Sequence, residues 1–233
     1  MRLFGIIGYP LGHSYSRKHF TEKFERESIT DHAYRKFELS DIGQLPGLLE
    51  REPELCGFNV TIPYKVQVID FLDEIEPVAS EIGAVNTVRV LRRNGRPYLQ
   101  GFNTDAPAFR ESLLRNLMTL PETALVLGTG GAARSVMYTL IDLNIIPVMV
   151  SRRPLRGGYS YDDLPGDVIS EAGLIVNATP VGMAPDIASM PPIDYSCLRD
   201  GQMLFDLTYN PPLTAFLAEG EAHGCQTVNG EEM

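Results

Sequence analysis

A glycine-rich turn in the second half of the chain constrains its fold most strongly. Gly128-Thr129-Gly130-Gly131 lies between an apolar segment, 124–127, and a segment with helical periodicity, 132–143. The pattern Gly-x-Gly-x-x-Ala, which ends at Ala133, is typical of the first strand–helix turn of a dinucleotide-binding fold. Its first glycine permits a tight turn, its second lets a pyrophosphate approach the backbone, and the helix start offers N–H groups to phosphate. A purely structural glycine turn is the alternative, and the flanking strand and helix favour cofactor binding.

Predicted strands and helices alternate along the rest of the chain, which indicates an α/β fold class. Asn94-Gly95 lies between two apolar stretches and predicts a β-hairpin. We expect an N-terminal α/β domain over residues 1–103 and a Rossmann-like domain over 104–233. Strands are expected at 3–8, 33–39, 58–62, 85–91, 98–102, 124–127, 147–150, 174–177, 203–207 and 226–229. Helices are expected at 16–27, 41–51, 64–72, 105–118, 132–143 and 213–219.

Composition argues against several classes of partner. The formal net charge is −10, so the long-range field repels nucleic acid and anionic membranes. No apolar run approaches membrane-spanning length. Cys56, Cys197 and Cys225 have neither zinc-site nor redox-motif spacing, which predicts no metal site and reduced thiols in a cytoplasmic protein.

Arginines after the second strand of the Rossmann-like domain indicate which dinucleotide binds. An NAD site usually has Asp or Glu about 20 residues past the turn, on the ribose 2′-hydroxyl. Here the strand ends in Ser151-Arg152-Arg153, Arg156 follows, and the first acid is Asp162. The guanidinium group pairs with phosphate and can stack on adenine. We therefore predict NADP rather than NAD, the alternative being a solvated basic loop.

Polar residues follow the predicted strands of the first half. Lys65 comes soon after a strand that Pro63 ends, and Thr61 lies four residues before it, an arrangement that suits proton exchange with an alcohol. Other polar groups stand at similar positions: Ser14 and Ser16, Asn86 and Thr87, and Asn103 to Asp105. Each has a plain structural alternative, as an exposed lysine, a helix cap or a turn residue. Taken together they predict a site, because ligands of open α/β sheets bind at strand ends.

These segments resemble the motifs of shikimate dehydrogenases over almost the whole chain. The opening motif is Gly8-Tyr9-Pro10-Leu11-Gly12-His13-Ser14-Tyr15-Ser16, and the central one is Asn59-Val60-Thr61-Ile62-Pro63-Tyr64-Lys65. The other similar segments are 83–87, 101–105, 128–134, 177–183 and 206–211, with Asn229-Gly230 beginning a last one.

The resemblance implies an oxidoreductase of the shikimate pathway to chorismate and aromatic amino acids. It would reduce 3-dehydroshikimate reversibly with NADP, in a cleft between a substrate-binding domain and an NADP-binding domain. Lys65 would be the catalytic acid/base, paired with Asp105. The implied substrate contacts are Ser14, Ser16, Thr61, Asn86, Asp105 and Tyr209. The expected cofactor contacts are Gly128, Thr129, Gly130, Gly131, Ala132, Ser151, Arg152, Arg153, Arg156, Thr179, Leu207 and Gly230.

Departures from the family pattern leave alternatives open. The usual Asn-Arg-Thr is Ser151-Arg152-Arg153, the stretch after Arg156 is short where many relatives have a helix, and the final motif is cut at Met233. The helices that normally close the substrate domain would follow that point. The alternatives are a quinate/shikimate dehydrogenase using NAD, a non-catalytic cofactor-binding paralogue, and a dehydrogenase of the methylene-tetrahydrofolate type. Ser16 argues mildly against quinate. The expected assembly is a monomer or homodimer.

Overall fold

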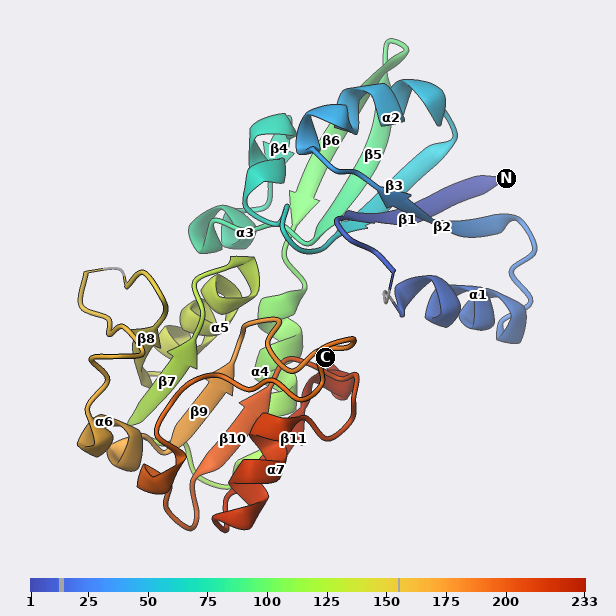
Figure 1. The fold of residues 1–233 in the computed structure, drawn as a ribbon. Helices are drawn as coiled ribbons and strands as arrows, with labels where there is room; N and C mark the ends of the chain where they lie inside the picture. Colours follow the sequence, from blue (N-terminus) through green and yellow to red (C-terminus); the bar gives the residue numbers. More distant parts are fainter. Residues whose placement is uncertain (13–14, 155) are drawn as a thin grey trace. The chain divides into compact units, whose positions relative to one another are not determined.

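The computed structural model describes residues 1–12, 15–154 and 156–233. The chain divides into two compact units, Met1–Thr104 and Asp105–Met233 (Figure 1). The predicted α/β class, with a Rossmann-like second unit, is confirmed by the two sheets.

The first unit is built on a six-stranded mixed sheet with the order β2-β1-β3-β5-β6-β4. β1 runs parallel to β2 and β3, whereas β5 runs antiparallel to β3 and β6. The strands are β1 (Arg2–Gly8), β2 (His32–Glu38), β3 (Leu55–Val60), β4 (Glu74–Ile75), β5 (Thr87–Arg93) and β6 (Arg96–Phe102). The predicted hairpin is confirmed: Asn94 and Gly95 join β5 to β6 with φ values of 51° and 77°, as a tight hairpin turn requires.

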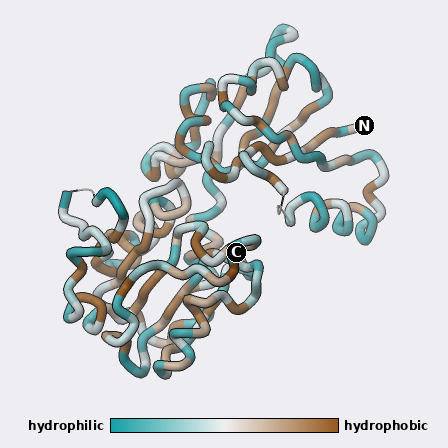
Figure 2. Tube along the Cα trace, in the orientation of Figure 1, coloured by the Kyte–Doolittle hydropathy of each residue, from teal (hydrophilic) through white to brown (hydrophobic). Residues whose placement is uncertain are grey.

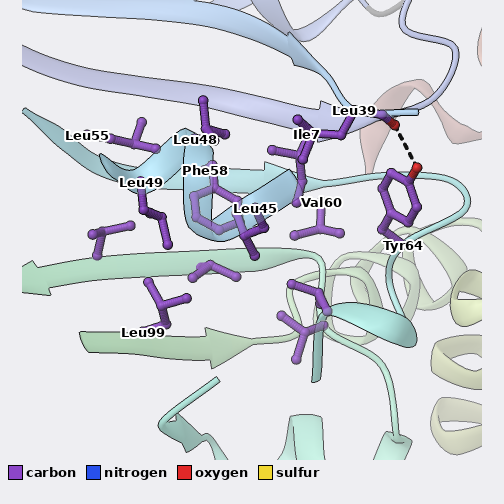
Figure 3. Packing of buried hydrophobic residues seen from close by; sticks show 14 of the residues in the cluster. Ile7, Leu39, Leu45, Leu48, Leu49, Leu55, Phe58, Val60, Tyr64 and Leu99 are labelled. Atoms are coloured by element: carbon purple, nitrogen blue, oxygen red, sulfur yellow. Dashed lines mark hydrogen bonds between the residues drawn. The ribbon is translucent and has the colours of Figure 1, made fainter. Parts of the chain in front are cut away.

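Among its described residues, the first unit has one helix of 11 residues and two shorter ones. They are α1 (Ser16–Arg26), α2 (Leu45–Arg51) and α3 (Pro77–Ile82), with 3₁₀ turns η1 (Ile42–Gln44) and η2 (Gln67–Phe71). α2 packs its leucines against one face of the sheet, where Leu45, Leu48 and Leu49 meet Phe58 of β3 (Figure 3). α1 has no fully buried residue and contacts the sheet through Phe20 and Phe24, as their spacing predicted.

Two predicted helices of this unit differ in the structure. The helix expected at 64–72 is wrong as an α-helix: a turn occupies residues 62–66, with a cis Ile62–Pro63 peptide, and only the 3₁₀ turn η2 follows. The helix expected at 41–51 is divided into η1 and α2, because Pro46 is placed in the first turn of α2, where its missing N–H costs nothing.

The second unit is a parallel sheet covered by helices on both faces. Its five strands have the order β11-β10-β9-β7-β8. They are β7 (Thr123–Leu127), β8 (Ile146–Val150), β9 (Leu174–Asn177), β10 (Met203–Asp206) and β11 (Gln226–Asn229). The helices are α4 (Asp105–Asn116), α5 (Gly131–Asp142), α6 (Gly166–Glu171) and α7 (Ala215–Ala222), with 3₁₀ turns η3 (Tyr195–Cys197) and η4 (Gly230–Glu232).

Each face of this sheet has its own hydrophobic core. Phe109 of α4 and Leu140 of α5 belong to one cluster, whereas Ile169 of α6 and Phe216 of α7 belong to the other. Figure 2 shows hydrophobic residues along the strands and mixed colours along the helices. Strands buried on both faces read as continuous apolar runs, which is why the sequence predicted β7, β9 and β10.

The third strand of a dinucleotide-binding sheet is reduced here to a single bridge. Val150 forms an isolated parallel bridge with Tyr159. The N–H of Ser151 donates to the Tyr159 carbonyl at 3.0 Å, and the Tyr159 N–H donates to that of Met149 at 2.9 Å. With Tyr159 placed outside β8, the strand order becomes that of the doubly wound nucleotide-binding fold.

Candidate active site

The polar segments predicted in the first half meet at one edge of the first sheet. β1 and β3 are parallel and both end there, while the antiparallel arrangement makes β5 begin and β6 end at the same edge. Thr61 and Lys65 follow β3, Asn86 precedes β5, and Thr104 follows β6. The sheet topology therefore gathers these side chains although they span more than 40 residues of sequence.

Backbone hydrogen bonds tie these loops to one another. The Tyr9 N–H donates to the Ile62 carbonyl at 3.0 Å, and the Thr61 N–H donates to that of Ile7 at 3.0 Å. The Lys65 carbonyl accepts from the Val85 N–H at 2.7 Å. This holds the lysine backbone beside the segment that carries Asn86, with the Lys65 side chain half-buried.

Asn86, a predicted substrate ligand, is held at both ends of its side-chain amide. It is 8% exposed, its Oδ1 accepts from the Thr104 N–H at 2.8 Å, and its Nδ2 donates to Thr104 Oγ1 at 2.8 Å. Asn103, which is 4% exposed, donates instead to the Ala84 carbonyl at 2.9 Å. Both ends of the Asn86 amide are therefore fixed, which suits a group that orients a small polar ligand.

The serine-containing loop is anchored on β2. The Glu38 carboxylate accepts from the Leu11 N–H at 2.7 Å, and Lys36 Nζ donates to the carbonyls of Leu11 and Gly12 at 2.9 and 3.3 Å. Ser14 lies outside the described residues. Ser16 is the first residue of α1, and the helix has Tyr15 as its N-cap without a side-chain hydrogen bond, so Ser16 does not serve as that cap.

A cavity of about 540 Å³ lies on the face of the first sheet that α1 partly covers. Its lining includes aromatic side chains, among them Phe20 and Phe24 from α1 and Phe4 from β1. Asn59 and Thr87 supply polar groups to the wall.

In the second unit, the glycine turn joins β7 to α5 as predicted. Gly128 has a φ of +116°, and a Cβ there would lie 3.0 Å from the Thr179 methyl and 3.1 Å from the Ala178 carbonyl. Gly130 is the N-cap of α5 with a φ of −73°, and a Cβ there would meet no atom of the described residues within 4 Å. The first glycine is thus required by the protein itself, whereas the space over the second is open. That difference fits a turn over which a pyrophosphate lies.

The arginines predicted for the cofactor follow β8 and are exposed: Arg152, Arg153 and Arg156. Ser151 differs from them, since it is 6% exposed and its hydroxyl has no hydrogen-bond partner within residues 1–12, 15–154 and 156–233. Tyr161 lies near this segment, and burial raises its pKa while Arg152 acts in the opposite direction.

A buried carboxylate orders the loops after β9 and β10. Asp206 and Asn177 are 0% exposed, and Asn177 Nδ2 donates to Asp206 Oδ1 at 3.1 Å. The same carboxylate accepts from the Thr208 N–H at 2.9 Å and from the Thr214 hydroxyl at 2.7 Å. Asn177 Oδ1 in turn accepts from the Thr179 hydroxyl at 2.6 Å. Burial raises the pKa of Asp206, and these donors oppose the rise.

This Asn177–Asp206 pair positions three residues predicted to contact ligands. Thr179 follows β9, while Leu207 and Tyr209 follow β10. Tyr209 is 41% exposed. In the sequence, Asn177 and Asp206 stand out only as the first residues of the similar segments 177–183 and 206–211. The sequence feature that could have indicated this pair is a polar residue at the end of each of two otherwise apolar strands.

Gly230, which begins η4, is required by a close backbone approach, because a Cβ there would collide with the Leu207 carbonyl. Within the described residues, no group of three or more His, Cys, Asp or Glu could hold a metal ion. No helix of the described chain has the length and apolar character needed to cross a membrane.

Comparison with known proteins identifies the family. Residues 6–88 match the family model of the shikimate dehydrogenase substrate binding domain. The chain is 35% identical to the shikimate dehydrogenase (NADP(+)) of Carboxydothermus hydrogenoformans, covering 100% of this chain and 87% of that protein. The chain belongs to the shikimate dehydrogenase family.

Other shikimate dehydrogenases agree over the same extent. The shikimate dehydrogenase (NADP(+)) of Symbiobacterium thermophilum is 36% identical, covering 100% of this chain and 84% of that protein. The crystal structure of shikimate 5-dehydrogenase from Thermus thermophilus, in complex with NADP(H) and shikimate, superposes with a TM-score of 0.83. It is 34% identical, and the match covers 99% of this chain and 87% of that one. The predicted family is confirmed.

Proposed function

We propose that this chain is an oxidoreductase that catalyses the reversible NADP-dependent reduction of 3-dehydroshikimate to shikimate. The observation that carries the proposal is the gathering of Thr61, Lys65 and Asn86 at one edge of the first sheet. The 34% identity to an enzyme solved with NADP(H) and shikimate supports it. The reaction is a step of the shikimate pathway to chorismate and aromatic amino acids.

Proton transfer is assigned to Lys65. Bound NADPH supplies the hydride that reduces the ketone. Lys65 donates a proton to the oxygen that becomes the hydroxyl, and it accepts that proton in the reverse direction. Asp105, the first residue of α4, is assigned to orient the reacting hydroxyl and to hold Lys65 in place.

Substrate binding is divided between the carboxylate and the ring hydroxyls. Ser14, Ser16 and Tyr209 are proposed to bind the carboxylate through their hydroxyl groups. Thr61 and Asn86 bind ring hydroxyls, since an amide supplies both a donor and an acceptor.

NADP is the cofactor that the second unit is suited to hold. The open space over Gly130 and the start of α5 accommodate the pyrophosphate. We assign the remaining turn contacts to Gly128, Thr129, Gly131 and Ala132. The exposed Arg152, Arg153 and Arg156, beside Ser151, supply positive charge for the 2′-phosphate. Thr179, Leu207 and Gly230 complete the cofactor contacts.

The remaining assignments concern partners, location, assembly and domains. The proposed partners are the small-molecule substrate and the cofactor, with neither nucleic acid nor membrane. We place the enzyme in the cytoplasm as a monomer or homodimer, with residues 1–103 as the substrate-binding domain and 104–233 as the NADP-binding domain.

Substitution of Lys65 tests the chemistry. Lys65→Ala is expected to lower kcat by at least about 100-fold, the lower range for general acid–base catalysis, with little change in shikimate affinity. Steady-state rates give kcat, and equilibrium binding gives the affinity. An unchanged kcat, or a kcat and a shikimate affinity that fall equally, would remove Lys65 from the chemistry. Thermal denaturation of the variant serves as the control for folding.

A further inference from the structure

Tyr34 is a buried polar side chain that the proposed mechanism does not use. It lies on β2, is 7% exposed, and stacks on Phe20 of α1 with ring centroids 4.5 Å apart and 13° between the ring planes. Its hydroxyl donates to Asn59 Oδ1 at 2.7 Å. Burial raises the pKa of Tyr34, whereas a hydrogen bond with Ser16 lowers it. The hydroxyl is therefore neutral at physiological pH and donates to Asn59.

A row of hydrogen bonds continues from Asn59 to Asn86. Asn59 and Thr87 lie opposite each other in the antiparallel pair of β3 and β5, and Asn59 Nδ2 donates to Thr87 Oγ1 at 3.2 Å. The Thr87 hydroxyl donates to Asn86 Oδ1 at 3.3 Å. The row thus begins at Tyr34 on β2, passes through β3 and β5, and ends at the predicted substrate ligand Asn86.

One backbone group fixes the direction of every bond in this row. The N–H of Thr104 can only donate, so the Asn86 atom 2.8 Å from it must be the oxygen. Thr87 must then give its single proton to that oxygen, and it can only accept from Asn59. The Asn59 amide nitrogen therefore faces Thr87, and its oxygen faces Tyr34. Tyr34 is the donor that satisfies this oxygen.

We propose that Tyr34 is a positioning residue: it holds the Asn59 amide oxygen, and so keeps the Thr87 hydroxyl as a donor to Asn86, whose own orientation Thr104 fixes. The kinetic part of this inference rests on the proposed function, in which Asn86 binds a substrate hydroxyl. Without the phenol, the Asn59 amide is free to rotate by half a turn. Its oxygen then accepts the Thr87 proton, and Asn86 loses that donor. Loss of one such bond corresponds to about a tenfold fall in kcat/KM for shikimate.

The experiment compares Tyr34→Phe with Tyr195→Phe. Tyr195 is a matched control in the second unit: it is 8% exposed, and its hydroxyl donates a single 2.7 Å hydrogen bond, to the Pro191 carbonyl. Burial raises its pKa as it does for Tyr34. Thr87→Val breaks the row one bond from Asn86 and keeps the Tyr34 hydroxyl, so it gives the Asn86 signal expected when the row no longer reaches that amide.

Two readouts separate the row from general destabilisation. The first is the NMR signal of the Asn86 side-chain amide in the protein without ligands, which should shift in Tyr34→Phe and Thr87→Val and stay in place in Tyr195→Phe. The second is kcat/KM for shikimate, which should fall about tenfold in the first two variants and in the double variant alike, since one row is broken once.

Unchanged Asn86 signals in Tyr34→Phe would overturn the inference. So would an equal fall of kcat/KM in Tyr195→Phe, or a double variant in which the two losses multiply. If the unmodified chain fails to oxidise shikimate, the proposed function fails, and the NMR signals still decide whether Tyr34 controls Asn86.

Discussion

Alanine substitutions at Gly128 and Gly130 should affect different properties, because the two glycines have different surroundings. Gly128→Ala should lower the stability of the fold, and Gly130→Ala should weaken NADP binding. Gly128 has a φ of +116°, and an added Cβ would lie 3.0 Å from Thr179 and 3.1 Å from the Ala178 carbonyl. Backbone strain of this kind costs about 1–3 kcal/mol, and the close contacts add to it. We therefore expect Gly128→Ala to lower the free energy of unfolding by about 2–4 kcal/mol, and Tm by roughly 5–10 °C.

Gly130→Ala should leave stability within about 1 kcal/mol of the unmodified protein, because its φ of −73° suits alanine and the nearby space is open. Its effect should fall on NADP. A methyl group at the start of α5 keeps the pyrophosphate from the backbone N–H groups, so Kd for NADP should rise by at least about tenfold, the equivalent of roughly 1.4 kcal/mol.

The assay pairs thermal denaturation with calorimetric titration of NADP. Gly201→Ala is the matched control for strain alone, since Gly201 lies in the same unit with a φ of +85° and no described atom within 4 Å of an added Cβ. It should lower Tm less than Gly128→Ala does and leave Kd unchanged. A Gly130→Ala protein that binds NADP normally would refute the reasoning, because the turn would then be purely structural.

Two further substitutions test the cofactor segment and the buried carboxylate. Arg152→Gln should raise KM for NADP about tenfold, as expected for one lost charge-assisted pair, and leave KM for NAD unchanged; steady-state rates with each cofactor measure this, and equal effects on both would contradict the 2′-phosphate assignment. Asp206→Asn should destabilise the protein by roughly 1–3 kcal/mol through the broken bonds to Asn177, Thr208 and Thr214. Burial raises the pKa of Asp206 above its ordinary value of 3.8, so its contribution to stability is largest at low pH and declines as pH rises through the raised pKa. Urea unfolding should therefore show that the difference in free energy of unfolding between the unmodified protein and Asp206→Asn becomes smaller as pH rises. A difference that becomes larger would contradict the burial argument.

Local patterns in the sequence predicted the elements whose stability is itself local. Asn94 and Gly95 favour positive φ on their own, and the hairpin between β5 and β6 follows. The apolar runs of β7 and β9 needed burial on both faces, which only a covered parallel sheet provides. The helix expected at 64–72 was wrong because a turn at 62–66 and the 3₁₀ turn η2 place apolar residues at a similar spacing. α3 and α6, of six residues each, are too short to show a period.

In the candidate site, too, local features could be predicted from the sequence, whereas contacts between distant residues could not. Strand ends indicated where Thr61, Lys65 and Asn86 lie, since parallel and antiparallel pairing brings such ends to one edge. The supporting bonds were not predicted, because they join residues far apart in sequence. Tyr34 and Asn59 are separated by 25 positions, and Asn177 and Asp206 by 29. Nothing in a single sequence indicates which polar residue will satisfy another at that distance.

Turnover of shikimate with NADP tests the central claim most directly. The rate of reduced-cofactor formation is followed with shikimate and NADP, then with NAD in place of NADP, and with quinate in place of shikimate. The account predicts turnover of shikimate with NADP, a much lower kcat/KM with NAD, and little activity on quinate. Turnover with NAD alone would contradict the role of the arginines after β8, and no turnover with any pair would contradict the proposed activity.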